Sequence, residues 1–208
     1  MSYETHLCGD FLTALASRSA APGGGTAAAL AGAMAAALTS MVCRLTVGNP
    51  KFAAEEAAVS EVLQEADELR TTLTWLMQQD TDAFLDLMAC YKLPKTTEAE
   101  QTLRRERIQE TAKNAARAPL AAMRACLRVA ELAEKAAQLG NPQAVSDAAV
   151  SVLLARAGLQ SAFYNVKINI GIISDQEFNN TTLAEANSLL DKAFRIEKNV
   201  LAEAERRM

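Results

Sequence analysis

The segment Pro22–Cys43 reads PGGGTAAALAGAMAAALTSMVC and contains no charged residue. Glycine has no side chain and loses much conformational entropy on folding, so three in succession add little packing but let backbone N–H groups approach another group closely. After them, Ala28, Gly32, Ala36 and Ser40 recur at every fourth residue and share one face of a helix. Because so smooth a face lets another backbone come close, we expect this helix to form the wall of a pocket.

Length and composition favour one all-helical domain. The chain has 208 residues, of which 50% are apolar and 5% aromatic, and runs of β-branched residues are scarce. This length suits a single domain, residues 1–208, with a sizeable core, and the abundance of Ala, Leu, Glu and Gln favours helix. We predict an all-α fold, a single multi-helix bundle of six to nine helices.

Charge and cysteine content exclude several classes of function. The net charge is −4 and the sequence pI about 5.2, and no basic patch stands out, so nucleic acid is not an expected partner. The cysteines and the single histidine show no metal-ligand spacing, and no nucleophilic triad surrounds the histidine. We expect no metal site, and free thiols in a reducing cytosol. These residues are Cys8, Cys43, Cys90, Cys126 and His6.

The uncharged segment is long enough to cross a membrane. Yet Ala, Gly, Ser and Thr fill most of it, and these residues gain little from contact with lipid. The residues before it include Glu4, Asp10 and Arg18 rather than the basic start of a signal peptide. We therefore predict a buried helix and no membrane partner.

Helix-terminating residues divide the remaining chain. The small-residue helix is expected to end near Gly48-Asn49-Pro50, and the long helix that follows to end before Leu93-Pro94. Thr97 begins a capping box for the next helix. Pro119 is expected to kink or break that helix, and Gly140 is a suitable residue to follow its end.

A further helix is predicted from the apolar seam that runs from Ala148 to Ile170. The polar segment 175–181 is expected to separate it from a last helix, with Thr182 as the cap of that helix. Segment 167–173 (KINIGII) has a strand-like composition, but a lone strand would have no partner.

One carboxylate falls on an apolar helix seam. In the long helix, apolar residues alternate at spacings of three and four, and the position that continues the seam is Asp80. An ionised group there must find a partner or shift its pKa. It is either a general base or partner for a cationic ligand, or a buried acid paired with a basic side chain; we favour the first, because buried acids are uncommon without a purpose. Asp82 and Asp86 lie off the seam and are expected to be solvated.

The glycine segment has two interpretations. Gly23, Gly24 and Gly25 at a helix N-terminus could cradle an anion with their free N–H groups. Alternatively they form a tight turn that Thr26 caps. No Lys-Ser/Thr pair follows and no strand precedes, so the segment is not a nucleotide P-loop.

Four further polar residues are candidates. Lys95 lies in a loop where lysines are usually only solvated, and Ser146-Asp147 has the pattern of an N-cap with a first-turn acid. Asn165 and Asn169 are four residues apart on one helix face. These two amides either bind a ring with adjacent donors and acceptors or form hydrogen bonds between helices.

Several short motifs in order along the chain resemble one family. Over roughly Phe11 to Phe178, the chain resembles the cyclodeaminase domain of formiminotransferase-cyclodeaminase and its stand-alone relatives, the methenyltetrahydrofolate cyclohydrolases. The matching motifs are Pro22–Thr26 with its Ala-rich helix, Met41-Val42, Gly48 before Phe52, Asp80–Phe84, Leu93–Lys95, Gly140-Asn141, Ser146-Asp147 and Tyr164–Asn169.

The resemblance implies an all-helical, cytoplasmic enzyme of folate one-carbon metabolism, usually a homodimer or larger, that needs no metal or redox cofactor. Members either cyclise 5-formiminotetrahydrofolate with release of ammonia or hydrolyse 5,10-methenyltetrahydrofolate to the 10-formyl form. Both reactions transfer protons beside an amidinium-like carbon between two folate nitrogens. We place the cyclodeaminase first and the cyclohydrolase as its alternative.

Motif matching assigns expected roles. Asp80 would take the proton and stabilise the cation, Lys95 would donate a proton or bind the folate's carboxylate tail, and Asp147 is a second acid. Asn165 and Asn169 would hold the pterin or the one-carbon bridge. The glycine segment would accept a carboxylate or hold its helix close to the ligand.

The residues after Gly48 depart from the family pattern, and two other classes of function stay open. The stretch Asn49-Pro50-Lys51 stands where relatives often carry more basic residues, which implies weaker binding of a polyglutamate tail. A non-catalytic helical scaffold would fit the amphipathic seams equally well. A binder of some other anionic metabolite would keep the glycine segment and need no carboxylate near it.

Overall fold

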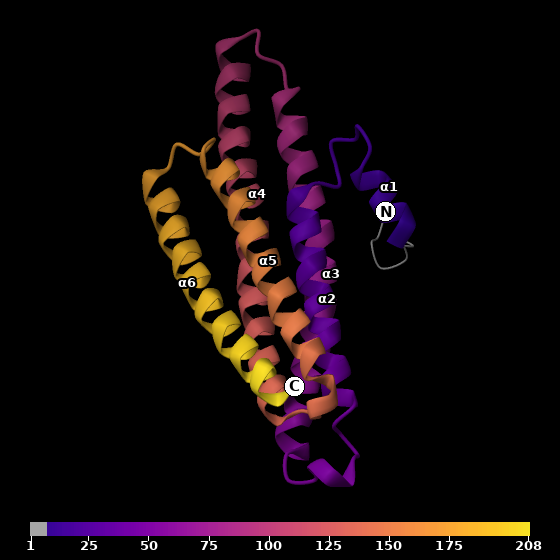
Figure 1. Ribbon diagram of the computed structural model, residues 1–208. Coiled ribbons are helices and arrows are strands. Elements are labelled where there is room, and N and C mark those ends of the chain that lie inside the picture. The colour runs from indigo at the N-terminus through magenta and orange to yellow at the C-terminus, as the bar shows by residue number, and fades with distance from the viewer. Residues whose placement is uncertain (1–7) are drawn as a thin grey trace.

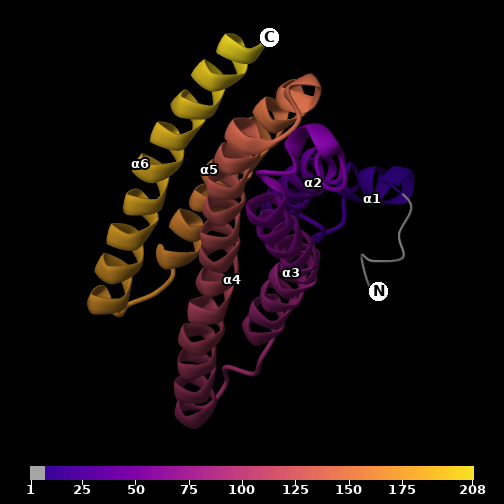
Figure 2. The same ribbon diagram turned by 90° about the horizontal axis from the view of Figure 1, so that it is seen from below.

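The computed structural model describes residues 8–208, which form six α-helices, two short 3-10 helices and no strand. This confirms the all-α prediction and the predicted number of helices. The long helices lie alongside one another, and α1 lies to one side of them (Figures 1 and 2). The elements are α1 (Cys8–Leu15), α2 (Gly24–Arg44), η2 (Pro50–Phe52), α3 (Glu56–Tyr91), α4 (Glu98–Leu139), η3 (Pro142–Ala144), α5 (Val145–Ile170) and α6 (Gln176–Arg207).

Helix α2 packs against α3, α4 and α5 at the centre of the bundle. Its small-residue face is fully covered rather than open: a Cβ added at Gly158 of α5 would lie 2.8 Å from the carbonyl oxygen of Ala28 and 3.2 Å from the backbone nitrogen of Gly32. The expectation that this face lines a pocket is therefore wrong, because α5 occupies the space that the missing side chains leave. Among the residues described, α2 is the one helix long and apolar enough to span a membrane, and 61% of its apolar window is buried inside the bundle.

Helices α3 and α4 form a long hairpin whose tip extends beyond the other helices (Figures 1 and 2). The α4 end of the tip is fixed by the predicted capping box, in which the Thr97 hydroxyl accepts from the Glu100 N–H and the Glu100 carboxylate accepts from the Thr97 N–H. Figure 2 shows the tip well separated from α5 and α6. The hairpin therefore holds its tip by its own packing.

Pro119 does not break its helix, since α4 continues through it to Leu139. Proline has no N–H, so in a regular helix the carbonyl of Ala115, four residues earlier, loses its partner. The side-chain amide of Asn169 in α5 donates to that oxygen at 2.6 Å. A hydrogen bond between helices thus replaces the missing bond within the helix.

One helix start differs from the prediction, and the predicted end of α4 before Gly140 is confirmed but without a left-handed glycine. Helix α6 begins at Gln176, because the Asp175 carboxylate accepts the N–H of Phe178, and Thr182 is buried within the helix instead of capping it. Gly140 ends α4 with a negative φ of −77°. A Cβ there would lie 2.8 Å from a methyl carbon of Val42, so the glycine allows close packing rather than a left-handed turn.

The start and end of α5 also correct the sequence expectations. Ser146 lies inside the helix and Ala144 is at its N-cap, so only the first-turn position of Asp147 was correctly predicted. Residues 167–170 continue the helix, in agreement with the rejection of a strand at 167–173. Every seam position predicted between Ala148 and Ile170 is buried.

Candidate active site

The Asp80 carboxylate of α3 lies directly against the first turn of α2. The Thr26 hydroxyl donates to Asp80 Oδ2 at 2.9 Å and lies 3.2 Å from the Thr81 hydroxyl. A Cβ added at Gly25 would lie 2.6 Å from both Cγ and Oδ2 of Asp80, so only glycine leaves room for this carboxylate. The glycine segment and the carboxylate on the seam, which the sequence singled out separately, therefore meet in the structure.

Asp80 is half-buried between α3 and α2. Burial raises the pKa of its carboxyl above the ordinary value, and hydrogen bonds from the hydroxyl and backbone N–H of Thr26 oppose that rise. Both of these hydrogen bonds to the carboxylate come from Thr26, and neither comes from a basic side chain. The expected alternative of a buried ion pair is thus not what this structure shows at Asp80, and the carboxylate can serve as a base.

The N-terminus of α2 begins at the N-cap Gly23, which makes no side-chain capping bond. Thr26 lies inside the first turn and bonds to Asp80, so it does not cap a tight turn as the alternative proposed. The positive end of the helix dipole therefore faces a carboxylate of the protein itself. A second anion at the same point would meet that negative charge, so the geometry favours the expectation that the glycine segment holds its helix close to a ligand.

Asn165 of α5 borders the same site. A Cβ added at Gly24 would lie 3.4 Å from Nδ2 of Asn165, an ordinary contact, and that amide nitrogen donates to Ser161 within its own helix at 3.0 Å. Asn165 therefore stands beside the glycine segment, as expected for a binding residue. Asn169, one turn further on, uses its amide to satisfy Ala115, and this matches the inter-helix alternative.

Two predicted site residues, Lys95 and Asp147, lie far from Asp80 in space. Helix α3 continues eleven residues beyond Asp80 to Tyr91, about 16 Å, and Lys95 lies past it, exposed at the hairpin tip in a pocket of about 230 Å³ with Gln101, Arg104 and Arg105. Asp147 is in the first turn of α5, eighteen residues and about 27 Å from Asn165 along that helix. Within one chain the structure does not bring either of them to Asp80.

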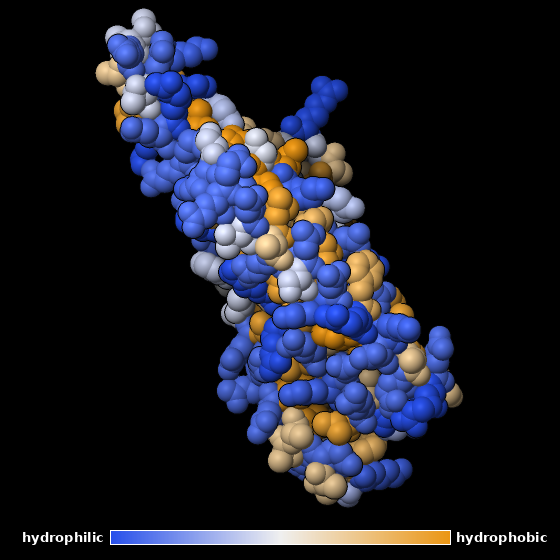
Figure 3. Space-filling model, turned by 90° about the vertical axis from the view of Figure 1, so that its left-hand side faces the viewer, coloured by the Kyte–Doolittle hydropathy of each residue, from blue (hydrophilic) through white to orange (hydrophobic). Residues whose placement is uncertain are grey.

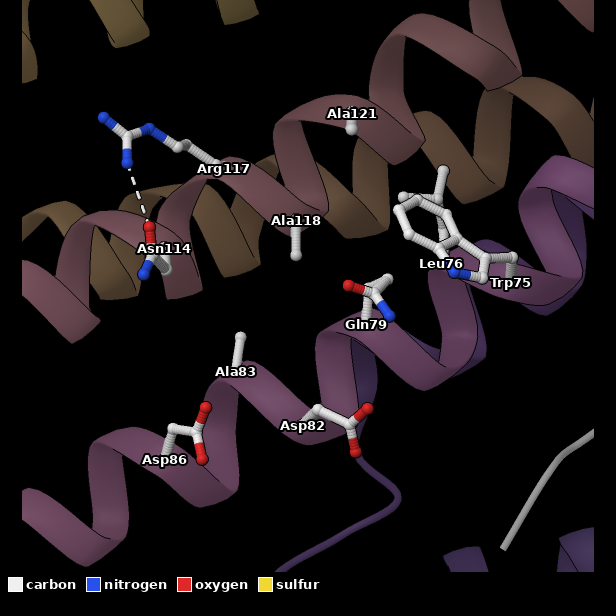
Figure 4. A pocket seen from close by; sticks show the side chains of 10 residues that line it. All are labelled: Trp75, Leu76, Gln79, Asp82, Ala83, Asp86, Asn114, Arg117, Ala118 and Ala121. Atoms are coloured by element: carbon white, nitrogen blue, oxygen red, sulfur yellow. Dashed lines mark hydrogen bonds between the residues drawn. The ribbon is translucent and has the colours of Figure 1, made fainter.

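A separate pocket of about 390 Å³ lies between α3 and α4 (Figure 4). The exposed Asp82 and Asp86 face it from α3, and Arg117 and Asn114, which bond to each other, face it from α4. The prediction that the two acids are solvated is confirmed. This pocket lies on a different side of α3 from the contact between Asp80 and Gly25.

The cysteines are free, as expected, and burial raises the thiol pKa of both Cys43 and Cys126 to about 12, so neither is a ready nucleophile. Within residues 8–208, no group of three or more His, Cys, Asp or Glu side chains is placed to hold a metal ion. The expectation for His6 lies outside the described residues.

Sequence reasoning missed two features of these sites. Thr81 shares the Thr26 contact beside the carboxylate, and its position next to Asp80 in the motif was the available signal. Nothing in the sequence indicated the pocket beside Trp75, because it forms only where two helices meet, with Ala83 of α3 facing Ala118 and Ala121 of α4.

Comparison with known proteins gives matches over most of the chain. A family model for formiminotransferase-cyclodeaminase matches residues 7–188. A methenyltetrahydrofolate cyclohydrolase of Methylorubrum extorquens is 46% identical over 88% of each chain. A formimidoyltransferase-cyclodeaminase of Rattus norvegicus is 32% identical over 88% of this chain, which spans 34% of that protein. The crystal structure of a formiminotetrahydrofolate cyclodeaminase from Thermotoga maritima matches with a TM-score of 0.88 over 97% of both chains at 29% identity.

Proposed function

This chain belongs to the formiminotransferase-cyclodeaminase family, and we propose that it is a methenyltetrahydrofolate cyclohydrolase, which opens the one-carbon bridge of 5,10-methenyltetrahydrofolate to give the 10-formyl form. It is an enzyme of folate one-carbon metabolism, as the sequence predicted; the relatives fit both the cyclodeaminase and the cyclohydrolase reaction. The choice of hydrolysis is supported by the 46% identity, which extends over 88% of both chains.

A cyclodeaminase activity is the second candidate. It is favoured by the match to the Thermotoga maritima structure over nearly the whole of both chains. In that reaction, N10 attacks the formimino carbon, the C–N10 bond forms, and ammonia leaves after protonation. A base beside the same carbon serves both reactions, so residue type alone does not separate them.

The observation that carries the proposal is the half-buried Asp80 carboxylate, which Thr26 holds against Gly25. In hydrolysis, water attacks the cationic carbon, the O–C bond forms, and Asp80 takes a proton from the water. The C–N5 bond then breaks while N5 receives a proton from the carboxyl group, and the second proton of the water goes to solvent. A raised pKa suits a group that must both take and return a proton near neutral pH.

Three further properties belong to the same proposal. The substrate is a reduced folate, and its cationic bridge would be stabilised by the carboxylate charge of Asp80. Since proton transfer to and from a carboxyl group suffices for the steps above, we propose that no metal or redox cofactor takes part. We also propose a cytoplasmic homodimer. The free cysteines are in line with a reducing compartment, and exposed apolar side chains on α2 and α5, among them Met34, Leu153 and Ile168, are in line with a subunit interface.

The test is an assay of the purified protein with each substrate, following absorbance of the methenyl chromophore against a reaction without enzyme. Hydrolysis removes the chromophore from 5,10-methenyltetrahydrofolate, whereas cyclisation of 5-formiminotetrahydrofolate creates it and releases ammonia. Asp80→Asn should lower the hydrolysis rate at least about 100-fold. Asp82→Asn, a matched change two residues away on the exposed side of α3, should not. Turnover of neither folate would overturn the proposed function.

A further inference from the structure

Two threonine hydroxyls and the Asp80 carboxylate form a row across the contact between α2 and α3. Thr26, in the first turn of α2, is completely buried, and Thr81, beside Asp80 on α3, is partly exposed. The Thr26 hydroxyl oxygen lies 2.9 Å from Asp80 Oδ2 and 3.2 Å from the Thr81 hydroxyl oxygen. The proposed proton steps use Asp80 and give the Thr81 hydroxyl no role.

The direction of these two hydrogen bonds follows from the number of hydrogens. A threonine hydroxyl has one hydrogen to donate and two lone pairs that accept, whereas an ionised carboxylate only accepts. The single hydrogen of Thr26 is therefore committed to Asp80 Oδ2. In the 3.2 Å contact Thr26 must then accept, and Thr81 donates. The chain of donation runs from Thr81 through Thr26 to Asp80.

Donation from Thr81 fixes the direction of the Thr26 hydroxyl. The hydrogen of a hydroxyl rotates to suit its partners, and Thr26 has two such partners on α3 within hydrogen-bond distance. While Thr81 donates to the Thr26 oxygen, the hydrogen of Thr26 is left for Asp80. Hydrogen bonds in a chain also polarise one another, so this donation strengthens the bond to the carboxylate.

No charged helix competes with Thr26 for the control of Asp80. Among residues 8–208, the causes that shift the pKa of this carboxyl are burial and the two hydrogen bonds from Thr26, and none is a charged side chain. Helix α2 carries no charged residue before Arg44. Helix α6 packs on α4 and α5, and hydrophilic side chains dominate the surface on its side of the molecule (Figure 3).

The charged side chains on the remaining helices near the contact are exposed or have partners of their own. They are Asp10 of α1, which is exposed, Asp82 of α3 with Gln78, Lys113 and Arg117 of α4 with Asp175 and Asn114, and Lys167 of α5 over the ring of Phe163. Hydrogen bonding by Thr26 is therefore what offsets burial at Asp80.

We propose that Thr81 is a positioning residue of this enzyme: by donating to Thr26, it keeps the Thr26 hydroxyl turned toward Asp80 and so holds the carboxylate in the orientation that proton transfer needs. This inference rests on the proposed function. Thr81 acts through Thr26, and the folate is not its partner. Loss of its hydroxyl should therefore disturb the proton-transfer step more than the binding of substrate.

Kinetics of two Thr81 variants test this role. Thr81→Val removes the hydroxyl at nearly the same size, and it should lower kcat for hydrolysis of 5,10-methenyltetrahydrofolate about tenfold while KM changes by less than about threefold. Because a weaker bond from Thr26 leaves burial less opposed, the pKa of Asp80 should rise. The lower-pH midpoint of the kcat/KM profile should then move up by about half a pH unit. Thr81→Ser keeps the hydroxyl and should restore both values.

A control and a double variant separate the hydrogen-bond chain from packing. Thr71→Val removes another hydroxyl of α3, one that donates only to the Asp67 carbonyl, and should change neither kcat nor the pH midpoint. In a Thr26→Val background, Thr81→Val should lower kcat by no more than about twofold further, since its effect passes through Thr26. A full tenfold loss there, or an equal loss in Thr81→Ser, would overturn the proposal. Circular dichroism checks that each variant is folded.

A titration without substrate distinguishes this inference from the proposed function. The carboxyl ¹³C resonance of Asp80, assigned by its absence in Asp80→Asn, should titrate about half a pH unit higher in Thr81→Val than in the wild type. An unchanged midpoint would overturn the role of Thr81 and leave the proposed function intact. A shifted midpoint in a protein whose wild type turns over neither folate would support the hydroxyl chain and count against the proposed function.

Discussion

Replacement of Gly25 by alanine is the sharpest test of the contact on which the candidate active site depends. The added Cβ would lie 2.6 Å from Cγ and Oδ2 of Asp80, whereas ordinary contacts of a Cβ begin near 3.4 Å. The carboxylate must therefore retreat by about 1 Å, and it would leave the Thr26 hydroxyl that now donates to it at 2.9 Å. A displacement of about 1 Å in a catalytic group costs about 100-fold in rate.

We expect Gly25→Ala to lower kcat/KM about 100-fold, or about 2.7 kcal/mol of transition-state stabilisation, in the methenyltetrahydrofolate assay. The neighbouring glycines supply matched controls. A Cβ at Gly24 would meet Asn165 at an ordinary 3.4 Å, and one at Gly23 would meet nothing within 4 Å. Both of those alanine variants should keep activity within about threefold, because neither moves the carboxylate.

Two further measurements separate an effect on Asp80 from an effect on the fold. Circular dichroism and thermal unfolding should show a helical, folded Gly25→Ala protein, since alanine is a better helix former than glycine. In an Asp80→Asn background, the same Gly25→Ala change should cost little further activity. If Gly25→Ala retains the activity of the Gly24→Ala control, the position of the carboxylate does not matter and the reasoning is refuted.

Three other substitutions test the energetics. Asp80→Asn should raise the melting temperature at pH 7, because burial raises the pKa of the native carboxyl and its ionised form opposes folding. This gain should vanish below about pH 4, where the carboxyl is protonated in both the folded and the unfolded state. A gain in melting temperature that is independent of pH would contradict this. Asn169→Ala should cost about 1–3 kcal/mol in urea unfolding, since it leaves the Ala115 carbonyl without a partner. The cost should shrink in a Pro119→Ala background, where position 119 regains an N–H, and equal costs in both backgrounds would show that the carbonyl is not the cause. Gly158→Ala should destabilise by about 1–3 kcal/mol, because its Cβ would lie 2.8 Å from the α2 backbone; an unchanged urea midpoint would show that α2 and α5 can separate without cost.

The predicted seams were correct because helical periodicity is a local property. The positions from Ala148 to Ile170 needed only a spacing of three or four residues to be identified, and all are buried. Asp80 stood out for the same reason, as the one acid on such a seam. Local rules failed where a distant group supplied a hydrogen bond or filled a space: Asn169 kept the helix whole at Pro119, and α5 covered the smooth face of α2.

The sequence by itself determined that this chain is helical, where most of its helices start and stop, and which carboxylate would be held away from water. These properties depend on the spacing of residues within one helix, about 1.5 Å per position. Only the tertiary structure decided which candidates meet. Antiparallel packing of α2 and α5 placed Gly24 beside Asn165, and the same packing left Asp147 about 27 Å away along α5. Which helix ends lie together depends on how whole helices pack, and the spacing of residues along the chain does not determine that packing.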